Sequence, residues 1–405
     1  MLDDLVLVLL VAAAVPLVLA AVPRLLVPAA VLEIVAGIVL GPDVLDLVDL
    51  DQAVQVVSTI GLAFLLFLAG LEIDLASLRG RSGQLALRGL AASLVLAALV
   101  GAVLDLAGIV GSGTFVAVLL IATSLGLVVP VLRDAQAADR PLGRLVVAGA
   151  SLGEVAALVL LSLSFSESGT GPGTVLLLVL ALAGAAVLLV LTGRRAARSP
   201  RIVRTVDRLA DTSAQLRVRL TVLLVVGLGA VAERLGLEAI LGAFLAGVVL
   251  RAVDPDGTMS HPHFRHKLEG LAFGFVVPVF FVASGLAFDL GALTAGPGAL
   301  AMVAVFLAAL LLVRGLPALA YRTSLTGREV VAAGLLQATS LPFLVAGTAI
   351  GSALGAIDPE DAAALVGAGL LSVVLFPALA LRLANDTGAD TDSASGVTLS
   401  AVEER

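Results

Sequence analysis

The sequence predicts an all-α integral membrane protein with thirteen transmembrane helices, arranged as two inverted-topology repeats with crossed, discontinuous helices 5 and 12. The first observation is composition, because 60% of the 405 residues are hydrophobic, 14% are charged and the mean hydropathy is +1.14. A bilayer solvates that much apolar surface, whereas a soluble core of this size does not need it. The other two observations are long apolar runs and an internal repeat.

Apolar runs of roughly 20 residues predict the helices in chain order. They cover residues 5–22, 25–40, 53–71, 86–105, 114–132, 143–166, 173–193, 218–234, 236–250, 270–290, 298–321, 329–352 and 361–383. The first run follows Met-Leu-Asp-Asp, which lacks the positive charge of a signal peptide. We therefore expect this run to be retained as a helix.

Basic residues indicate how the predicted helices are oriented. All but two of the 24 Lys and Arg residues fall in alternate connections between helices, and the exceptions are Arg234 and Arg314. Positive charge collects on the cytoplasmic side of a membrane. The sequence therefore predicts a multi-pass protein of the bacterial cell (inner) membrane, with its N-terminus outside and its C-terminus in the cytoplasm.

Short segments recur at a nearly constant distance. Gly70-Leu71 recurs 215 positions later as Gly285-Leu286, and Ala122-Thr123-Ser124-Leu125 recurs 216 positions later as Ala338-Thr339-Ser340-Leu341. A weaker pair, residues 37–40 and 247–250, lies 210 apart. Helix 3 thus matches helix 10 and helix 5 matches helix 12. The helices of each matched pair are seven spans apart. Because seven is odd, matched helices should cross the membrane in opposite directions.

This repeat predicts four segments along the chain. Residues 1–193 hold the first repeat (helices 1–6) and connector helix 7, and residues 218–384 hold the second repeat (helices 8–13). Residues 194–217 are basic, with apolar residues at helical spacing, which predicts a cytoplasmic amphipathic linker on the inner leaflet. Residues 385–405 are polar and are expected to be a disordered cytoplasmic tail.

Helix-breaking and hydroxyl residues interrupt helices 5 and 12 at matching places. They are Thr123, Ser124, Gly126 and Pro130 in helix 5, and Thr339, Ser340, Pro342 and Gly347 in helix 12. Broken helices occur at membrane depth only where protein or a cavity satisfies their backbone groups. Two that cross would offer oxygen ligands to a small cation. Alternatively, the hydroxyls bond to their own helices and the prolines only kink them. Recurrence in register favours the cation site, with Gln337 nearby.

Glu154 lies midway along helix 6. A carboxylate at the bilayer centre costs about 2.5–3.5 kcal/mol on insertion scales, so it usually has a partner or a function. Ser151 lies on the same helical face, and Gly149 and Gly153 let another helix approach. We predict a site for a monovalent cation or a proton at Glu154, Ser151, Thr123 and Ser124. The alternative is a protonated structural Glu154.

Two further charged residues lie deep in predicted spans. Arg314 in helix 11 could pair with Glu154, or with a broken-helix carbonyl, when no ion is bound; alternatively, it extends to the cytoplasmic interface. Glu33 in helix 2 could pair with Arg314, titrate separately or join a packed network. Arg314, Glu33, Gln337, Thr339 and Ser340 are therefore predicted to support the site.

The histidine and cysteine content limits which metal, thiolate and pH-sensing sites the chain can form. Cysteine is absent, which excludes disulfides and thiolate sites. The three histidines, His261, His263 and His266, share one cytoplasmic loop, where they could sense pH or simply be solvated. Their spacing is a poor match to a metal site. No cofactor is expected, and no nucleic-acid partner.

Four segments resemble the monovalent cation:proton antiporter family, in its Kef-like and sodium/proton exchanger branch. They are residues 32–42 (LEIVAGIVLGP), 67–71 (FLAGL), 242–247 (GAFLAG) and 278–282 (PVFFV). The resemblance covers nearly all of the predicted helices. It implies a homodimer with a dimerisation unit and a mobile core containing helices 5 and 12. It also implies that Glu154 carries the ion or proton and that Arg314 faces it.

Two positions depart from the family pattern. Family members often carry Asp-Asp, Asn-Asp or Gln-Asp where this chain has Gly153-Glu154, and some have Thr-Asp where it has Thr123-Ser124. With a single carboxylate, the electrogenic mode associated with paired aspartates is not expected.

The resulting functional prediction is a secondary antiporter, not an enzyme. It would exchange Na⁺ or K⁺ for H⁺ by alternating access, one for one. Three alternatives remain at this point: an organic-anion/sodium symporter of similar architecture, a membrane-embedded enzyme, and a sensor or channel. A symporter of this kind is expected to have more Asn and Gln in the broken helices. A membrane-embedded enzyme is expected to have nucleophile–base pairs or metal ligands.

Overall fold

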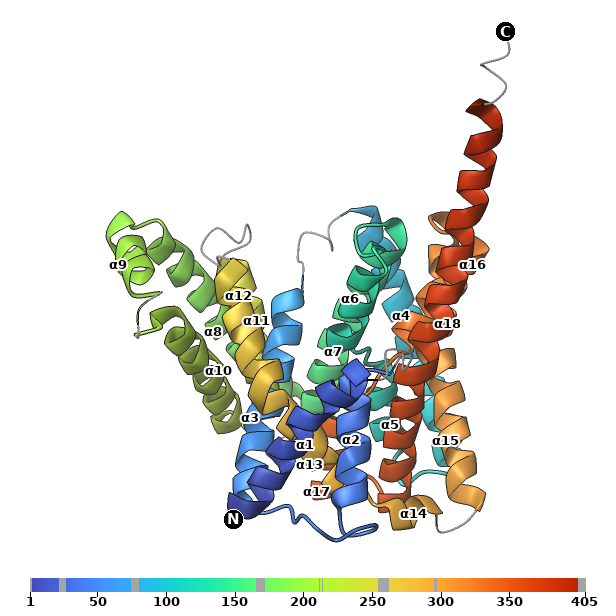
Figure 1. Ribbon diagram of the computed structural model, residues 1–405, viewed down its shortest axis with the longest axis horizontal. Coiled ribbons are helices and arrows are strands. Elements are labelled where there is room, and N and C mark those ends of the chain that lie inside the picture. Colours follow the sequence, from blue (N-terminus) through green and yellow to red (C-terminus); the bar gives the residue numbers. More distant parts are fainter. Residues whose placement is uncertain are drawn as a thin grey trace. The chain divides into compact units, whose positions relative to one another are not determined.

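The computed structural model describes an all-helical chain (Figure 1). The described residues are 2–21, 27–73, 80–164, 172–210, 212, 214–253, 262–294 and 297–399, and none of them lies in a strand. Among these residues, ten helical segments are long and apolar enough to cross a membrane, and α2 (Ala29–Leu40) and α11 (Ala239–Val253) are shorter apolar helices. The predicted helical membrane fold is confirmed, whereas the number of crossings, thirteen, stays a prediction.

Every predicted range contains at least one helix. The range 218–234 corresponds to α10 (Leu216–Arg234), which is not among the ten long apolar segments. Its ends carry charge at Arg217, Arg219, Glu233 and Arg234, and these lower its apolar character.

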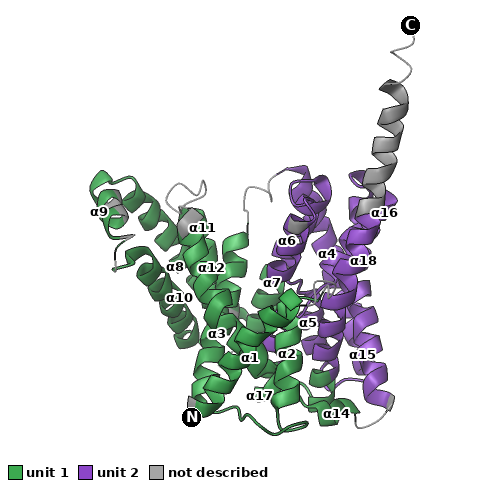
Figure 2. Cartoon of the chain, in the orientation of Figure 1, with its two compact units in different colours: residues 1–75, 155–296, 349–363 green, residues 76–154, 297–348, 364–405 purple. Residues whose placement is uncertain are grey.

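The chain folds into two compact units, coloured separately in Figure 2. Unit 1 comprises residues 1–75, 155–296 and 349–363, and unit 2 comprises residues 76–154, 297–348 and 364–405. Each unit takes segments from both predicted repeats. The predicted segments 1–193 and 218–384 describe repetition along the sequence rather than compact units, and that division stays a prediction.

Unit 1 is a bundle of helices from the beginning and the middle of the chain. Its helices, besides α2, α10 and α11, are α1 (Leu2–Ala21), α3 (Gln52–Glu72), α8 (Pro172–Ala197), α9 (Pro200–Ala210), α12 (Pro262–Leu271), the π-helix η1 (Ala272–Val276), α13 (Val277–Leu286) and α14 (Leu290–Thr294). The segments α12, η1 and α13 follow one another without a gap, so they form a single long rod.

The repeated glycine segments make equivalent close contacts within unit 1. A Cβ on Gly37 of α2 would lie 2.9 Å from the Cα of Gly285 in α13. A Cβ on Gly247 of α11 would likewise lie 2.9 Å from the carbonyl carbon of Gly70 in α3. Gly37 and Gly247 belong to one repeated pair of segments and Gly70 and Gly285 to another. The same backbone-to-backbone contact therefore occurs twice, once between each pair of helices.

Unit 2 contains the interrupted helices. Its elements are α4 (Arg81–Leu106), α5 (Gly113–Ile121), α6 (Leu125–Asp134), most of α7 (Pro141–Ser164), α15 (Pro297–Leu310), the π-helix η2 (Leu311–Gly315), the 3₁₀ helix η3 (Leu316–Thr323), α16 (Gly327–Gln337), the first part of α17 (Pro342–Ala353) and most of α18 (Pro359–Leu399). One apolar cluster joins α6, α7, η3 and α16 around Leu132, Val146, Tyr321 and Leu336.

Two predicted segments lie partly outside the described residues. The linker 194–217 contains the end of α8, the short helix α9 and the start of α10, with residues 211 and 213 not described. In the predicted tail 385–405, α18 ends at Leu399, the side chains from residue 385 onward are not described, and residues 400–405 lie outside the described part.

Candidate functional site

The first break separates α5 from α6. Residues 122–124 leave the helical conformation, and both Ala122 and Ser124 have extended backbones. The predicted interruption at Thr123 and Ser124 is confirmed, whereas Gly126 and Pro130 lie within α6 and do not interrupt it. The Thr123 hydroxyl is turned away from its own helix and donates to the carbonyl of Gln337, 2.5 Å away.

The second break separates α16 from α17 at residues 338–341, as predicted for Thr339 and Ser340, whereas Gly347 lies within α17. Pro342 opens α17, where the absence of a backbone N–H is tolerated. The hydroxyl of Thr339 donates to the Leu335 carbonyl one turn earlier, at 3.1 Å. On α18, Ser372 accepts from the Ser340 N–H at 3.1 Å and so satisfies a backbone group that the break exposes.

The two breaks meet directly. The backbone N–H of Ser124 donates to the Thr339 carbonyl at 2.9 Å, in addition to the bond from Thr123 to Gln337. Residues 214 and 215 positions apart in the chain, in two candidate membrane spans, are therefore joined by these hydrogen bonds to backbone carbonyls. The predicted crossing of helices 5 and 12 is confirmed in this respect.

Arg314 lies against the first break and is 1% exposed. Its Nε donates to the Thr123 hydroxyl at 2.8 Å, its Nη1 to Ser93 at 3.2 Å and its Nη2 to the Gly149 carbonyl at 2.9 Å. These hydrogen bonds hold the guanidinium in unit 2 through two hydroxyls and a carbonyl of α7. The pairing of Arg314 with a carboxylate stays a prediction.

The local backbone around Arg314 is unusual. The residue lies in η2, a π-helical turn followed at once by the 3₁₀ helix η3. A π-turn inserts one extra residue into a helix and rotates the side chains that follow, and such turns are frequent at functional sites. Gly153 gives the guanidinium room, because a Cβ there would lie 2.6 Å from Nη2.

Glu154 and Ser151 lie on α7 beside these groups and are 5% and 2% exposed. Ala150, one turn before Glu154, packs against Leu125 and Val129 of α6, so this part of α7 faces the start of α6. The Ser151 hydroxyl has no hydrogen-bond partner among the described residues, and neither does that of Ser340. Unit 2 thus gathers one carboxylate and several hydroxyls near the two breaks.

Sequence reasoning did not single out four residues of this region as parts of the site: Ser93, Gly149 as a carbonyl ligand, Tyr321 and Ser372. Gln337 Nε2 donates to the Tyr321 hydroxyl at 2.7 Å, and Tyr321 is fully buried. Single polar residues within long apolar helices were the available signal, because buried polar groups are usually hydrogen-bonded. Their partners could not be read from the sequence.

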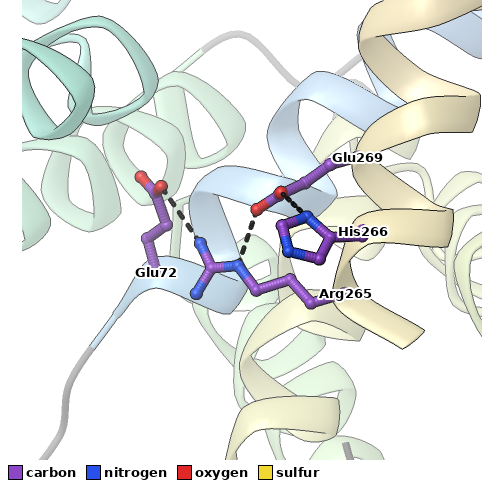
Figure 3. A network of polar contacts seen from close by, with 4 residues as sticks. All are labelled: Glu72, Arg265, His266 and Glu269. Carbon is purple, nitrogen blue, oxygen red and sulfur yellow. Dashed lines mark hydrogen bonds and ion pairs between the residues drawn. The ribbon is translucent and has the colours of Figure 1, made fainter. Parts of the chain in front are cut away.

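Glu33 and the histidines belong to unit 1. Glu33 lies on α2 and is 4% exposed, and its predicted supporting role stays a prediction. His261 and the side chain of His263 lie outside the described residues. Residues 263 and 266 lie on α12, so their predicted place in a loop is wrong. The His266 side chain is 76% exposed, with Nδ1 3.6 Å from Glu269. Arg265 contacts Glu269 at 2.6 Å and Glu72 at 3.5 Å (Figure 3). The pH-sensing role of the histidines stays a prediction.

Comparison with known proteins places this geometry in a family. Residues 7–381 match the family model described as "Sodium/hydrogen exchanger, transmembrane". YjbQ of Bacillus subtilis is 30% identical over 369 residues, covering 87% of this chain and 58% of YjbQ. The Na⁺/H⁺-K⁺ antiporter GerN of Bacillus cereus is 26% identical over 357 residues, covering 85% of this chain and 87% of GerN. The chain therefore spans little more than half of YjbQ but most of GerN.

A solved structure has the same fold. The sodium proton antiporter MjNhaP1 from Methanocaldococcus jannaschii, determined at pH 8, matches with a TM-score of 0.68, 20% sequence identity and coverage of 95% of this chain and 98% of that one. Because the family model covers nearly the whole chain, the protein belongs to the transmembrane sodium/hydrogen exchanger family.

Proposed function

We propose that this protein is a secondary antiporter that exchanges a monovalent cation, Na⁺ or K⁺, for H⁺ by alternating access. Family membership supports this function, as do the names of GerN and MjNhaP1. The observation that carries the proposal is the buried Glu154 on the stretch of α7 that packs against the start of α6, next to the meeting of the two breaks.

The proposed chemistry is competition at Glu154. The carboxylate binds either a proton or a cation, with the hydroxyls of Ser151, Thr123 and Ser124 as further oxygen ligands. Hard monovalent cations prefer such oxygen donors. Because one rival must leave before the other binds, the two fluxes are coupled. Arg314 supplies a fixed positive charge nearby, while Gln337, Thr339 and Ser340 hold the breaks in place.

The proposed assembly and orientation follow the sequence predictions. The protein acts as a homodimer, with unit 2 as the moving part and unit 1 at the dimer contact. Its N-terminus lies outside the bacterial inner membrane and its C-terminus inside. Arginine-rich segments at alternate connections support this orientation.

The test is transport in proteoliposomes that contain a pH-sensitive dye. Addition of Na⁺ or K⁺ outside should alkalinise the interior when protein is present, and Glu154→Gln should abolish this signal. Glu233→Gln is the matched control, because Glu233 is an exposed acid on α10 and its loss should leave the rate unchanged. An unaltered rate in Glu154→Gln would refute the assignment.

A further inference from the structure

Arginine is concentrated in one short stretch of the chain. Residues 194–219 contain eight arginines and two aspartates, although the whole chain has 24 basic residues and a net charge of −7. This stretch forms the end of α8, the short helix α9 and the start of α10 in unit 1. One third of the basic residues therefore lie in 26 positions, around a single short helix.

Three of these arginines form a line along α9, which we name the arginine stripe: Arg201, Arg204 and Arg208. The spacing of three and four residues puts them on one face of the helix, and all three are exposed. Val206 and Leu209, on another face, are partly buried, and α9 contacts α8 and α10. The helix thus rests on its neighbours and presents the stripe outward.

Protein groups do not neutralise the stripe within the described residues. The ion pairs found there involve none of its three arginines. Arg204 Nε donates to the Pro200 carbonyl of its own helix, at 3.1 Å. Three like charges within two helical turns repel one another, so an arrangement of this kind favours an anionic ligand from outside the chain.

The connection to α8 puts the stripe close to the end of a candidate membrane span. The candidate span in α8 ends at Ala197, and only Arg198 and Ser199 separate it from α9. Three chain steps cover at most about 11 Å. Arg194, near the end of α8, also donates to the Ala252 carbonyl at the end of α11, at 2.8 Å. Figure 1 shows α9 at this end of the helices of unit 1.

We infer that the arginine stripe of α9 binds the headgroup phosphates of anionic phospholipids in the cytoplasmic leaflet. Guanidinium groups bind phosphate through paired hydrogen bonds, and basic residues beside a span are attracted to anionic leaflets. The lipid holds α9, and with it the connection between α8 and α10, on the bilayer. This inference needs the membrane fold and the proposed orientation, but it does not depend on Glu154 or on antiport.

The absence of cysteine makes a direct test possible. Thr205→Cys introduces one labelling site on the exposed side of α9, beside Arg201 and Arg208. The labelled protein is reconstituted into phosphatidylcholine vesicles containing a headgroup nitroxide on either phosphatidylglycerol or phosphatidylcholine, at equal mole fraction. We expect stronger quenching by the phosphatidylglycerol probe, and the difference should disappear at high salt.

Charge variants then assign the effect to the stripe. Changing all three stripe arginines to Gln should weaken the phosphatidylglycerol preference on the order of 100-fold, since each basic residue contributes about fivefold. Changing all three to Lys should keep most of it. The matched control changes Arg133, Arg140 and Arg322 to Gln; these are three exposed arginines of unit 2, and their loss should leave the preference intact.

Three outcomes would overturn the inference. Equal quenching by the two probes would show no preference for anionic lipid. An equal loss in the control triple variant would show that net charge, not the stripe, is responsible. Full competition by inorganic phosphate, but not by chloride at the same ionic strength, would show a site for a soluble anion instead of a lipid.

Discussion

At the scale of single residues, the central feature is a guanidinium buried among neutral partners. Removing a charge from water is costly, and hydrogen bonds to the charged group offset part of that cost. Arg314 donates such bonds to the hydroxyls of Thr123 and Ser93 and to the Gly149 carbonyl. Thr123 also bonds to Gln337. The Thr123 hydroxyl thus links Arg314 to the second break. Its loss should therefore affect the hydrogen bonding of both.

The first prediction concerns that hydroxyl. Thr123→Val keeps the shape of the side chain but leaves Arg314 Nε without its partner, which should lower the free energy of unfolding by about 1.5–3 kcal/mol. Thr123→Ser should restore most of it. Thr59→Val is the control, since Thr59 is exposed and its hydroxyl donates to the Gln55 carbonyl of its own helix. Thermal unfolding of the purified protein measures all three, and equal effects at both threonines would contradict the prediction.

The second prediction concerns the space around Gln337. A Cβ on Gly149 would lie 2.3 Å from Gln337 Nε2 and 2.6 Å from the Tyr321 hydroxyl. Gly149→Ala should therefore destabilise the protein by about 1–3 kcal/mol, the usual range for overpacking. At Gly184 on α8 a Cβ would meet nothing within 4 Å, so Gly184→Ala should be neutral or stabilising. Melting temperatures of the two variants in one detergent compare them directly.

At the scale of elements, the two breaks could be predicted and their surroundings could not. Repeated hydroxyl residues identified both interruptions, because short polar side chains compete for backbone hydrogen bonds. Pro342 opens the helix after the second break, whereas Pro130 lies within α6 and marks no break. The π-turn that carries Arg314 gave no comparable signal. It lies in an apolar stretch with no proline at its centre, and the partners of Arg314 come from α4, the first break and α7, whose mutual register is set by tertiary packing.

The third prediction tests how α18 supports the second break. Ser372 accepts from the Ser340 N–H at 3.1 Å and donates to the Gly369 carbonyl at 2.7 Å. In Ser372→Ala the buried N–H loses its partner, so the break should open more often. Hydrogen–deuterium exchange of a peptide covering residues 338–342 should become faster. Thr348→Val is the control, because the Thr348 hydroxyl donates to carbonyls of its own helix. Faster exchange in both variants would count against the prediction.

The fourth prediction concerns the start of α3. The Val54 N–H donates to Asp51 at 2.9 Å, and this bond lowers the pKa of Asp51 below its ordinary value of 3.8. The charged carboxylate therefore stabilises the helix above about pH 4, and the effect is lost as the pH falls through the lowered pKa. Asp51→Asn should melt earlier than the parent protein at neutral pH, with the gap closing below about pH 4. A constant gap across the pH range would exclude the charge as its cause.

At the scale of the whole molecule, the sequence predicted the class of fold but not its division into units. Apolar length and charge placement are properties of single segments, which is why every predicted range contains a helix. Contacts such as Gly37 with Gly285 and Gly70 with Gly247 join segments far apart. Through such contacts the beginning and the middle of the chain pack together in unit 1. A repeat read along one sequence shows which segments correspond, but not which ones pack together.

The last prediction follows from the single carboxylate at the proposed site. If Glu154 exchanges one proton for one cation, a full cycle moves no net charge, so membrane potential should not change the equilibrium gradient. A cycle that moved one charge would gain about 2.3 kcal/mol per 100 mV, which is about 50-fold in the accumulation ratio. Proteoliposomes with a potential set by a gradient of permeant thiocyanate, and with cation and pH followed together, separate the two cases. A potential-dependent ratio would contradict one-for-one exchange while leaving antiport itself in place.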